Sequence, residues 1–193
     1  MKVALILGGA RSGKSRYAVE LAQALGPSIL YLATCRPADA EMRRRITRHR
    51  RERPSTWRTL EAPDDLPAAL LAHSRWPEGR GTASIGGSRS ADGVLLDCLT
   101  LYLADLLRRH RRDALVEREV ARLCRALPQV RCPVIVVSNE VGAGVVPERP
   151  LGRRFRDLAG WANQAVARCA DRVILMVAGM PLVVKSETAD VTA

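Results

Sequence analysis

Five short apolar runs recur along the chain and alternate with longer segments of helical spacing. The runs are VALIL (3–7), ILYLA (29–33), VLLD (94–97), PVIVVS (133–138) and VILMVA (173–178). They are continuous and rich in β-branched residues, which is typical of strands buried on both faces of a parallel sheet. A further apolar run about Gly179, Met180 and Pro181 predicts a terminal hairpin, and with it one antiparallel edge strand.

Between these runs, apolar residues recur three or four positions apart, as they do on one face of a helix. The four sets are Tyr17, Leu21 and Leu25; Leu99, Leu103 and Leu106; Val116, Val120 and Leu123; and Leu151, Phe155, Leu158 and Ala162. Because strands alternate with helices, the sequence predicts an α/β fold with a mostly parallel sheet flanked by helices. A length of 193 residues and a hydrophobic content of 47% fit a single domain over residues 1–185.

Two segments lack this pattern. Residues 74–93 are rich in Gly, Ser and Arg without periodicity and predict a mobile surface loop within the domain. Residues 186–193 are polar and predict a flexible tail. No apolar run is long enough to cross a bilayer, and the N-terminus lacks the regions of a secretory signal, so we expect a cytoplasmic protein.

The charge balance and the cysteines narrow the class of partner only slightly. A net charge of +11 and a pI near 10.4 indicate an anionic partner, such as a nucleotide, a phosphorylated substrate or a nucleic acid. An arginine excess is equally compatible with codon usage or a solvated surface, so the charge does not decide which of these partners binds.

The five cysteines are widely spaced without a C-x-x-C pair, which favours buried thiols over disulfides or a zinc site.

Residues 8–15, GGARSGKS, match the phosphate-binding pattern G-x-x-x-x-G-K-[ST]. The pattern lies between a predicted strand and an amphipathic helix, where glycines let backbone amides turn toward phosphate oxygens and the helix presents its positive end. We expect Lys14 to reach the β- and γ-phosphates and Ser15 to ligate Mg²⁺. The predicted nucleotide-binding loop comprises Gly8, Gly9, Ala10, Arg11, Ser12, Gly13, Lys14 and Ser15.

Asp97 ends the third predicted strand. A carboxylate at that position is suited to contact the same Mg²⁺ ion, directly or through water, so the predicted metal site comprises Ser15 and Asp97. The alternative is that Asp97 caps the helix that begins at Cys98, and the two roles are compatible.

His49 lies among seven arginines in a helix predicted between Pro37 and Pro54, where Met42, Ile46 and His49 share one face. Guanidinium groups can neutralise a triphosphate, and they favour the neutral imidazole, which can act as a nucleophile on phosphorus. From the residues alone, a histidine on a solvated or nucleic-acid-binding helix is the simpler alternative.

Taken together, five blocks resemble one enzyme family. They are GGARSGKS (8–15), YLATC (31–35), EMRRRITRHRRERPSTWRTLEAP (41–63), LLDCLT (95–100) and VSNEVGAGVVPERPLGRRFRDLAGWANQAVA (137–167). The chain is similar, over nearly its whole length, to the bifunctional adenosylcobinamide kinase and adenosylcobinamide-phosphate guanylyltransferase of cobalamin biosynthesis. The resemblance implies a RecA-like P-loop NTPase fold, a homotrimer, phosphorylation of adenosylcobinamide with ATP or GTP, and transfer of GMP from GTP to give adenosylcobinamide-GDP.

The resemblance also implies site residues. The family's guanylyl carrier, a histidine in an R-I-x-x-H pattern, falls on His49, which joins Lys14 as a predicted catalytic residue. Some members carry glutamate where this chain has Asp97. The guanine-nucleotide contacts fall on residues 8–15, on Ala33, Thr34 and Cys35, on Arg50, Arg51, Glu52 and Arg53, and on Glu61 and Asp97.

The expected partners are GTP, ATP, Mg²⁺ and a corrinoid, without nucleic acid. Two alternatives remain: a P-loop small-molecule kinase in which His49 has no chemical role, and a RecA-like ATPase whose arginine helix binds nucleic acid. An aromatic content of 4% disfavours the second, because few side chains can stack on bases. Asn139 and Glu140, after the fourth predicted strand, are candidates either for orienting substrate or for closing a loop.

Overall fold

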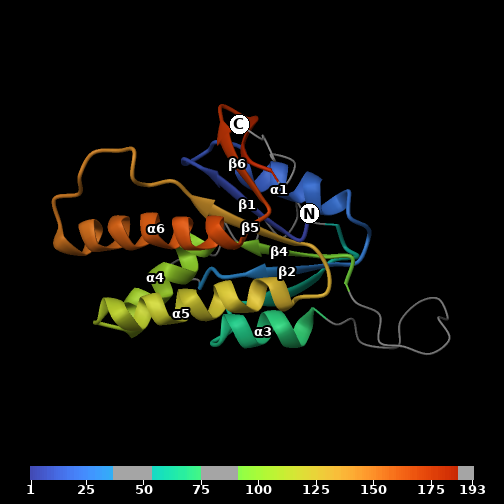
Figure 1. The fold of residues 1–193 in the computed structure, drawn as a ribbon, viewed down its shortest axis with the longest axis horizontal. Coiled ribbons are helices and arrows are strands. Elements are labelled where there is room, and N and C mark those ends of the chain that lie inside the picture. Colours follow the sequence, from blue (N-terminus) through green and yellow to red (C-terminus); the bar gives the residue numbers. More distant parts are fainter. Residues whose placement is uncertain (37–53, 75–90, 187–193) are drawn as a thin grey trace, which may run out of the picture.

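The structure is a computed structural model that describes residues 1–36, 54–74 and 91–186. Its elements, drawn in Figure 1, are β1 (Val3–Gly8), α1 (Lys14–Gln23), β2 (Ile29–Ala33), β3 (Arg58–Glu61), α3 (Leu66–His73), β4 (Gly93–Asp97), α4 (Leu99–Arg109), α5 (Asp113–Ala126), a 3₁₀ turn (Leu127–Gln129), β5 (Val134–Asn139), α6 (Pro150–Cys169), β6 (Arg172–Val177) and β7 (Met180–Lys185).

The strands form one sheet in the order β3-β2-β4-β5-β1-β6-β7. All neighbouring pairs are parallel except β6 and β7, which are antiparallel. One strand, β5, separates β1 from β4. The predicted α/β class, parallel sheet and antiparallel edge are therefore confirmed.

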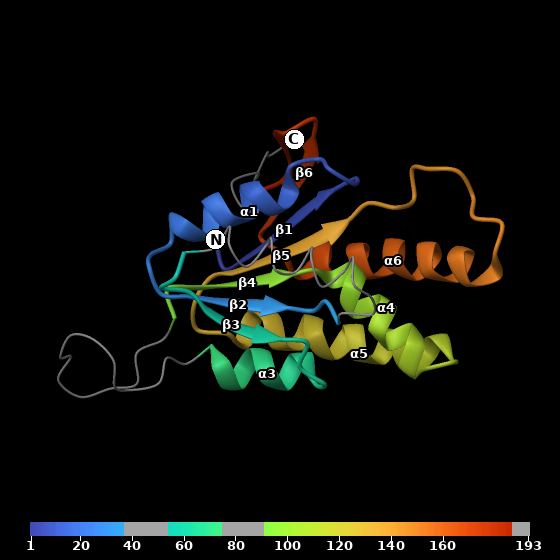
Figure 2. The same ribbon diagram turned by 180° about the vertical axis from the view of Figure 1, so that it is seen from behind.

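Helices cover the two faces of the sheet unequally. Successive residues of β1 alternate between two cores, with Val3 and Leu5 in one and Ala4 and Ile6 in the other, as the twofold period of a strand requires. The first core is closed by α3, α4, α5 and α6, and the second is closed on the opposite face by α1 (Figure 2). Both faces of the central strands are thus buried.

Two elements were not predicted. Strand β3 is four residues long, Leu60 is its one apolar residue, and its alternating burial is a weak signal beside the continuous apolar runs. Helix α3 follows Asp65, whose carboxylate accepts a hydrogen bond from the Ala68 amide, with Pro67 in the first turn. Both are common helix-start signals, but the apolar residues in Leu66–His73 lack the one-sided pattern by which a helix is predicted.

The loop predicted over residues 74–93 extends too far at both ends. Ser74 and Ala91 are buried, and the Ala91 amide donates to the Ser74 carbonyl at 3.0 Å, so both ends belong to the core. Gly93 already begins β4, while residues 75–90 lie outside the described part of the chain.

Within the described residues, no helix combines the length and the apolarity needed to cross a bilayer.

The terminal hairpin turns one or two residues earlier than predicted. Its connection is Ala178–Gly179, since Val177 pairs with Met180 and Pro181 already lies in β7. Both connecting residues have positive φ, 51° for Ala178 and 84° for Gly179. Two such residues make a type I′ turn, whose twist matches that of the flanking strands.

Replacing Ala178 with asparagine should stabilise the fold. Asparagine tolerates positive φ better than alanine, and Asn-Gly is the preferred type I′ pair, so we expect the free energy of unfolding to rise by about 0.5–1 kcal/mol. The β-branched variant Ala178→Val should lower it. Urea denaturation of the three proteins measures both changes, and a less stable Ala178→Asn would contradict the assigned turn.

Candidate active site

The candidate site lies where the chain reverses its direction of winding across the sheet. Helix α1 leads from β1 toward β2 on one face, while α6 leads from β5 across to β6 on the other. The adjacent strands β1 and β5 therefore flank a topological switch point, and ligands of open α/β sheets bind at the carboxyl ends of such strands. The phosphate loop predicted from the sequence begins there, at Gly8.

The phosphate loop is held by backbone contacts to both of its neighbours. The Glu140 amide, after β5, donates to the Gly8 carbonyl at 3.0 Å, and the Gly179 amide, in the hairpin turn, donates to the Ser12 carbonyl at 3.0 Å. Gly13 has a φ of +89°, and a Cβ there would lie 3.2 Å from the Gly179 Cα. Glycine is therefore required at this position both by the left-handed backbone and by the close approach.

Inside the loop, two side chains are arranged as a phosphate site requires. The Lys14 Nζ donates to the Gly9 carbonyl at 3.0 Å, which holds the ammonium group across the loop. The Ser12 hydroxyl is buried and, within the described residues, has no hydrogen-bond partner. A buried polar group without a partner is costly, and a phosphate oxygen is the acceptor that this loop geometry provides for. The loop therefore fits a nucleotide phosphate.

Three other predicted contacts meet at the same edge of the sheet. Ala33 at the end of β2 lies opposite Glu61 of β3 on one side and opposite Asp97 of β4 on the other. Parallel strands are about 4.8 Å apart, so Asp97 lies roughly 10 Å across the sheet from Gly8, with β5 between them. The structure thus places these residues along one edge of the sheet.

The end of β4 is fixed to the end of β2. The Thr34 hydroxyl donates to the Cys98 carbonyl at 2.7 Å and accepts from the Cys98 amide at 2.8 Å. The Tyr31 hydroxyl donates to Asp97 Oδ2 at 2.7 Å. Asp97 therefore contacts Tyr31 through its side chain, whereas Cys98 is the N-cap residue of α4, and the alternative of Asp97 as a helix cap is wrong.

Cys98 lies in this edge but is unsuited to nucleophilic chemistry. Burial raises the pKa of its thiol to about 11, and the nearby Asp97 carboxylate acts in the same direction. The thiolate, which is the reactive form, is therefore scarce at neutral pH. Cys98 and Cys132 are buried as predicted, while Cys35, Cys124 and Cys169 are partly exposed, and none of these five described cysteines forms a disulfide.

Asn139 and Glu140 make structural hydrogen bonds. The Asn139 Nδ2 donates to the Thr100 hydroxyl at 3.0 Å, and Glu140 Oε1 accepts from the Gly142 amide at 2.6 Å. The Asn139 carbonyl accepts from Asn163 Nδ2 at 3.1 Å. These contacts favour loop closure over substrate orientation as the role of both side chains.

Several predicted residues lie outside the described part of the chain. They are His49, Arg50, Arg51, Glu52 and Arg53, together with the predicted helix that carries them. Reasoning from the sequence also missed Gly179, because a glycine in a hairpin turn far along the chain gives no sign of contact with the phosphate loop.

Comparison with known proteins identifies the family. A model of the family described as cobinamide kinase / cobinamide phosphate guanyltransferase matches residues 4–184. The chain belongs to this family. The resemblance inferred from the motifs is thereby confirmed, and with it an enzyme of the kinase and nucleotidyltransferase classes.

Curated relatives agree with this assignment. The bifunctional adenosylcobalamin biosynthesis protein CobP of Pseudomonas aeruginosa is 46% identical over 186 residues, covering 95% of this chain and 97% of that protein. The bifunctional adenosylcobalamin biosynthesis proteins CobU of Salmonella typhimurium and Escherichia coli are each 36% identical, covering 94% of this chain and 98% of theirs. The KaiC-like protein PH0186 of Pyrococcus horikoshii aligns over 90% of this chain and 70% of its own, with 12% identity and a TM-score of 0.48.

Proposed function

We propose that this chain phosphorylates adenosylcobinamide with ATP or GTP and then transfers GMP from GTP, giving adenosylcobinamide-GDP. The observation that carries the proposal is a phosphate loop with an unpartnered buried hydroxyl, at the switch point of a chain that belongs to the cobinamide kinase and guanyltransferase family. The relatives named as bifunctional adenosylcobalamin biosynthesis proteins span nearly the same length, which supports both activities in this single chain.

The guanylyl transfer proceeds through His49. Its neutral imidazole attacks the α-phosphorus of GTP, a P–N bond forms, and the bond to the pyrophosphate oxygen breaks. A phosphate oxygen of adenosylcobinamide phosphate then attacks the same phosphorus, and His49 leaves. Lys14 and the arginines at 50, 51 and 53 stabilise the negative charge on the phosphoryl oxygens during both displacements.

Three groups of residues bind the nucleotide. Residues 8–15 bind the phosphates, while Ala33, Thr34, Cys35 and Glu61, at the ends of β2 and β3, contact the remainder of GTP. Arg50, Arg51, Glu52 and Arg53 complete the site. In the kinase step the γ-phosphoryl group moves to the aminopropanol hydroxyl, and its loose transition state depends mainly on positioning and charge neutralisation.

Ser15 and Asp97 would hold Mg²⁺ beside the phosphates. A hydroxyl and a carboxylate are hard oxygen donors of the kind that Mg²⁺ prefers. Within the part of the chain that the structure describes, no cluster of three or more His, Cys, Asp or Glu could hold a metal by itself. Such a site relies on nucleotide oxygens and water for its other ligands, and the bound ion would neutralise charge on the phosphates.

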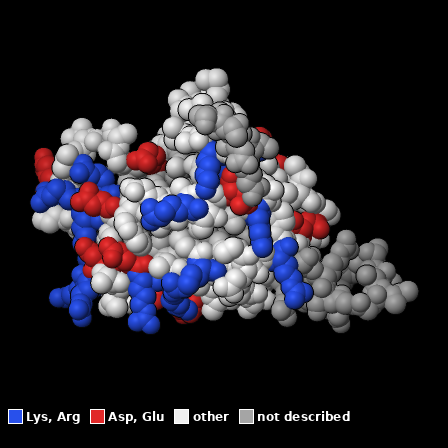
Figure 3. Space-filling model, viewed as in Figure 1, with Lys and Arg blue, Asp and Glu red and all other residues white. Residues whose placement is uncertain are grey.

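The nucleic-acid alternative finds no support on the surface of Figure 3. Lys and Arg side chains there are interspersed with Asp and Glu rather than gathered in one stripe. Several of the arginines form ion pairs, as Arg122 does with Asp65 and Arg154 with Asp113. On the described residues of this face, the paired arginines do not form the continuous basic surface that a nucleic-acid site requires; the arginine-rich segment 37–53 lies outside the described residues.

Strand β7 supports self-association, and the number of three subunits comes from the family resemblance. Its apolar side chains are unusually exposed, with Met180 at 66%, Leu182 at 56% and Val184 at 63%. An apolar edge strand left open to water promotes association, so we propose that a neighbouring subunit covers it.

Radioactive GTP tests the histidine intermediate. Incubation with GTP labelled at the α-phosphate should place an acid-labile, alkali-stable label on the wild-type protein, because a P–N bond is formed. His49→Ala should lose the label, whereas His73→Ala, which changes an exposed histidine at the end of α3, should keep it. An active enzyme that never acquires the label would leave only the kinase alternative.

A magnesium titration tests Asp97. Asp97→Asn keeps an oxygen that can accept from the Tyr31 hydroxyl but removes the negative charge. We expect the Mg²⁺ concentration for half-maximal kinase activity to rise about tenfold or more, while the control Asp157→Asn, at an exposed site on α6, leaves it unchanged. The metal role of Asp97 is wrong if both variants titrate like the wild type.

Light scattering after size-exclusion chromatography tests the assembly. The wild type should have three times the chain mass of 21.1 kDa. Leu182→Glu should reduce this mass by placing a charge in the proposed interface, and Leu115→Glu, at another exposed position, on α5, should not. A monomeric wild type would refute the proposed trimer.

A further inference from the structure

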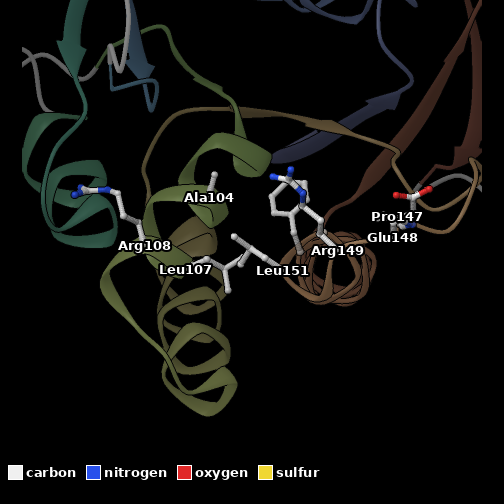
Figure 4. Close-up of a pocket in the computed structure, with 9 residues that line it drawn as sticks. Ala104, Leu107, Arg108, Pro147, Glu148, Arg149 and Leu151 are labelled. Carbon is white, nitrogen blue, oxygen red and sulfur yellow. The ribbon is translucent and has the colours of Figure 1, made fainter.

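A cavity of about 760 Å³ lies between the second half of α4, the loop over residues 140–149 and the first turns of α6 (Figure 4). Its volume is within the range of about 300–1,000 Å³ that small-molecule sites occupy. The cavity is separate from the phosphate loop, and none of the nucleotide-binding residues that the structure describes lines it.

The walls of this cavity originate beside the nucleotide site. Helix α4 leaves the end of β4 directly after Asp97, and the loop over 140–149 leaves the end of β5 beside Gly8. The buried Thr100 hydroxyl accepts from Asn139, which joins the start of α4 to the end of β5. Figures 1 and 2 show the start of α6 and the far end of α4 extending beyond the carboxyl edge of the sheet. The cavity therefore lies on the edge that carries the phosphate loop.

Hydrogen bonds and close packing hold the cavity open. Arg153 Nη1 donates to the carbonyls of Pro147 and Glu148, at 3.1 and 2.6 Å, and so ties the loop to the first turn of α6. A Cβ at Gly152 would lie 2.7 Å from the Pro147 Cβ, which shows how closely the loop packs there. Arg154 Nε donates to Asp113 at 2.5 Å and fixes α6 against the start of α5. The site is preformed rather than created by a ligand.

The lining combines an apolar wall with charged groups. Leu107, Leu151 and Phe155 supply the wall, and Leu151 is 63% exposed although it continues the apolar stripe of α6. Arg149 contributes a guanidinium group, whereas that of Arg108 points away from the other lining side chains in Figure 4 and pairs with Asp105. A large apolar side chain left exposed inside a preformed cavity, with polar groups around it, indicates a bound ligand.

We propose that this cavity binds the corrin macrocycle of the substrate, an inference that rests on the proposed activity toward cobinamide. A corrin ring is broad, carries methyl groups on its faces and bears amide side chains around its edge. The apolar wall would contact the ring, Arg149 would donate to amide oxygens, and the Glu148 carboxylate would accept from amide nitrogens. The aminopropanol arm is then on the same edge as the nucleotide.

A tryptophan in the cavity tests the proposal. Ala104 is exposed on α4 and lines the cavity, so Ala104→Trp fills the space without disturbing the core. We expect the KM for adenosylcobinamide to rise about tenfold or more, while the KM for GTP and the labelling of His49 by GTP alone stay unchanged. The control is Ala72→Trp, which changes an exposed alanine on α3 outside the cavity.

A second pair of variants tests the amide contacts. Arg149→Ala should weaken adenosylcobinamide binding, measured by equilibrium dialysis, about tenfold, whereas Arg118→Ala on the exposed face of α5 should not.

The outcomes separate this proposal from the activity on which it rests. A wild type that neither phosphorylates adenosylcobinamide nor accepts GMP from GTP refutes the proposed function. A wild type that does both, with an Ala104→Trp variant whose KM for adenosylcobinamide stays within about twofold, refutes the cavity alone. An Ala104→Trp variant that instead changes the mass of the assembly would show that a second copy of the chain occupies the cavity, which also overturns the proposal.

Discussion

The backbone of the phosphate loop must keep a conformation that it cannot maintain by itself. Arg11 and Gly13 both have positive φ, and few residues adopt that region without support. The support comes from the hairpin turn, whose Gly179 amide binds the Ser12 carbonyl, and from the start of the 140–149 loop, whose Glu140 amide binds the Gly8 carbonyl. The nucleotide site therefore depends on three segments that are far apart in the sequence.

Hydrogen bonds also link the nucleotide site to the rest of the molecule. Buried polar groups at the ends of parallel strands need partners, and here they bond to one another across strands. Ser138 donates to Asn163, and Asn139 and Thr100 connect β5 to α4. These bonds fix where α4 and α6 leave the sheet, and hence the cavity between them. One hydrogen-bonded edge thus positions both the phosphate loop and the proposed corrinoid site.

Much of this architecture could be predicted from the chain. Continuous β-branched runs indicated the central strands to within a residue at each end, because a strand buried on both faces has little freedom in composition. The phosphate loop was recognisable because its glycines, lysine and serine are required at fixed spacing by the chemistry of phosphate binding. The edge strand β3 was missed, since a half-exposed strand of four residues has no comparable constraint.

The sequence by itself determined the fold class, the family and the residues of the phosphate loop, because each depends on local patterns. Only the tertiary structure decided that Asp97 accepts a hydrogen bond from Tyr31 and does not cap α4. It also decided that Gly179 lies close to Gly13 and that Leu151 lines a cavity. The first two contacts join residues 66 and 166 positions apart, and the third depends on a surface built from several elements. Their geometry is set by how strands and helices pack, which the local order of residues does not encode.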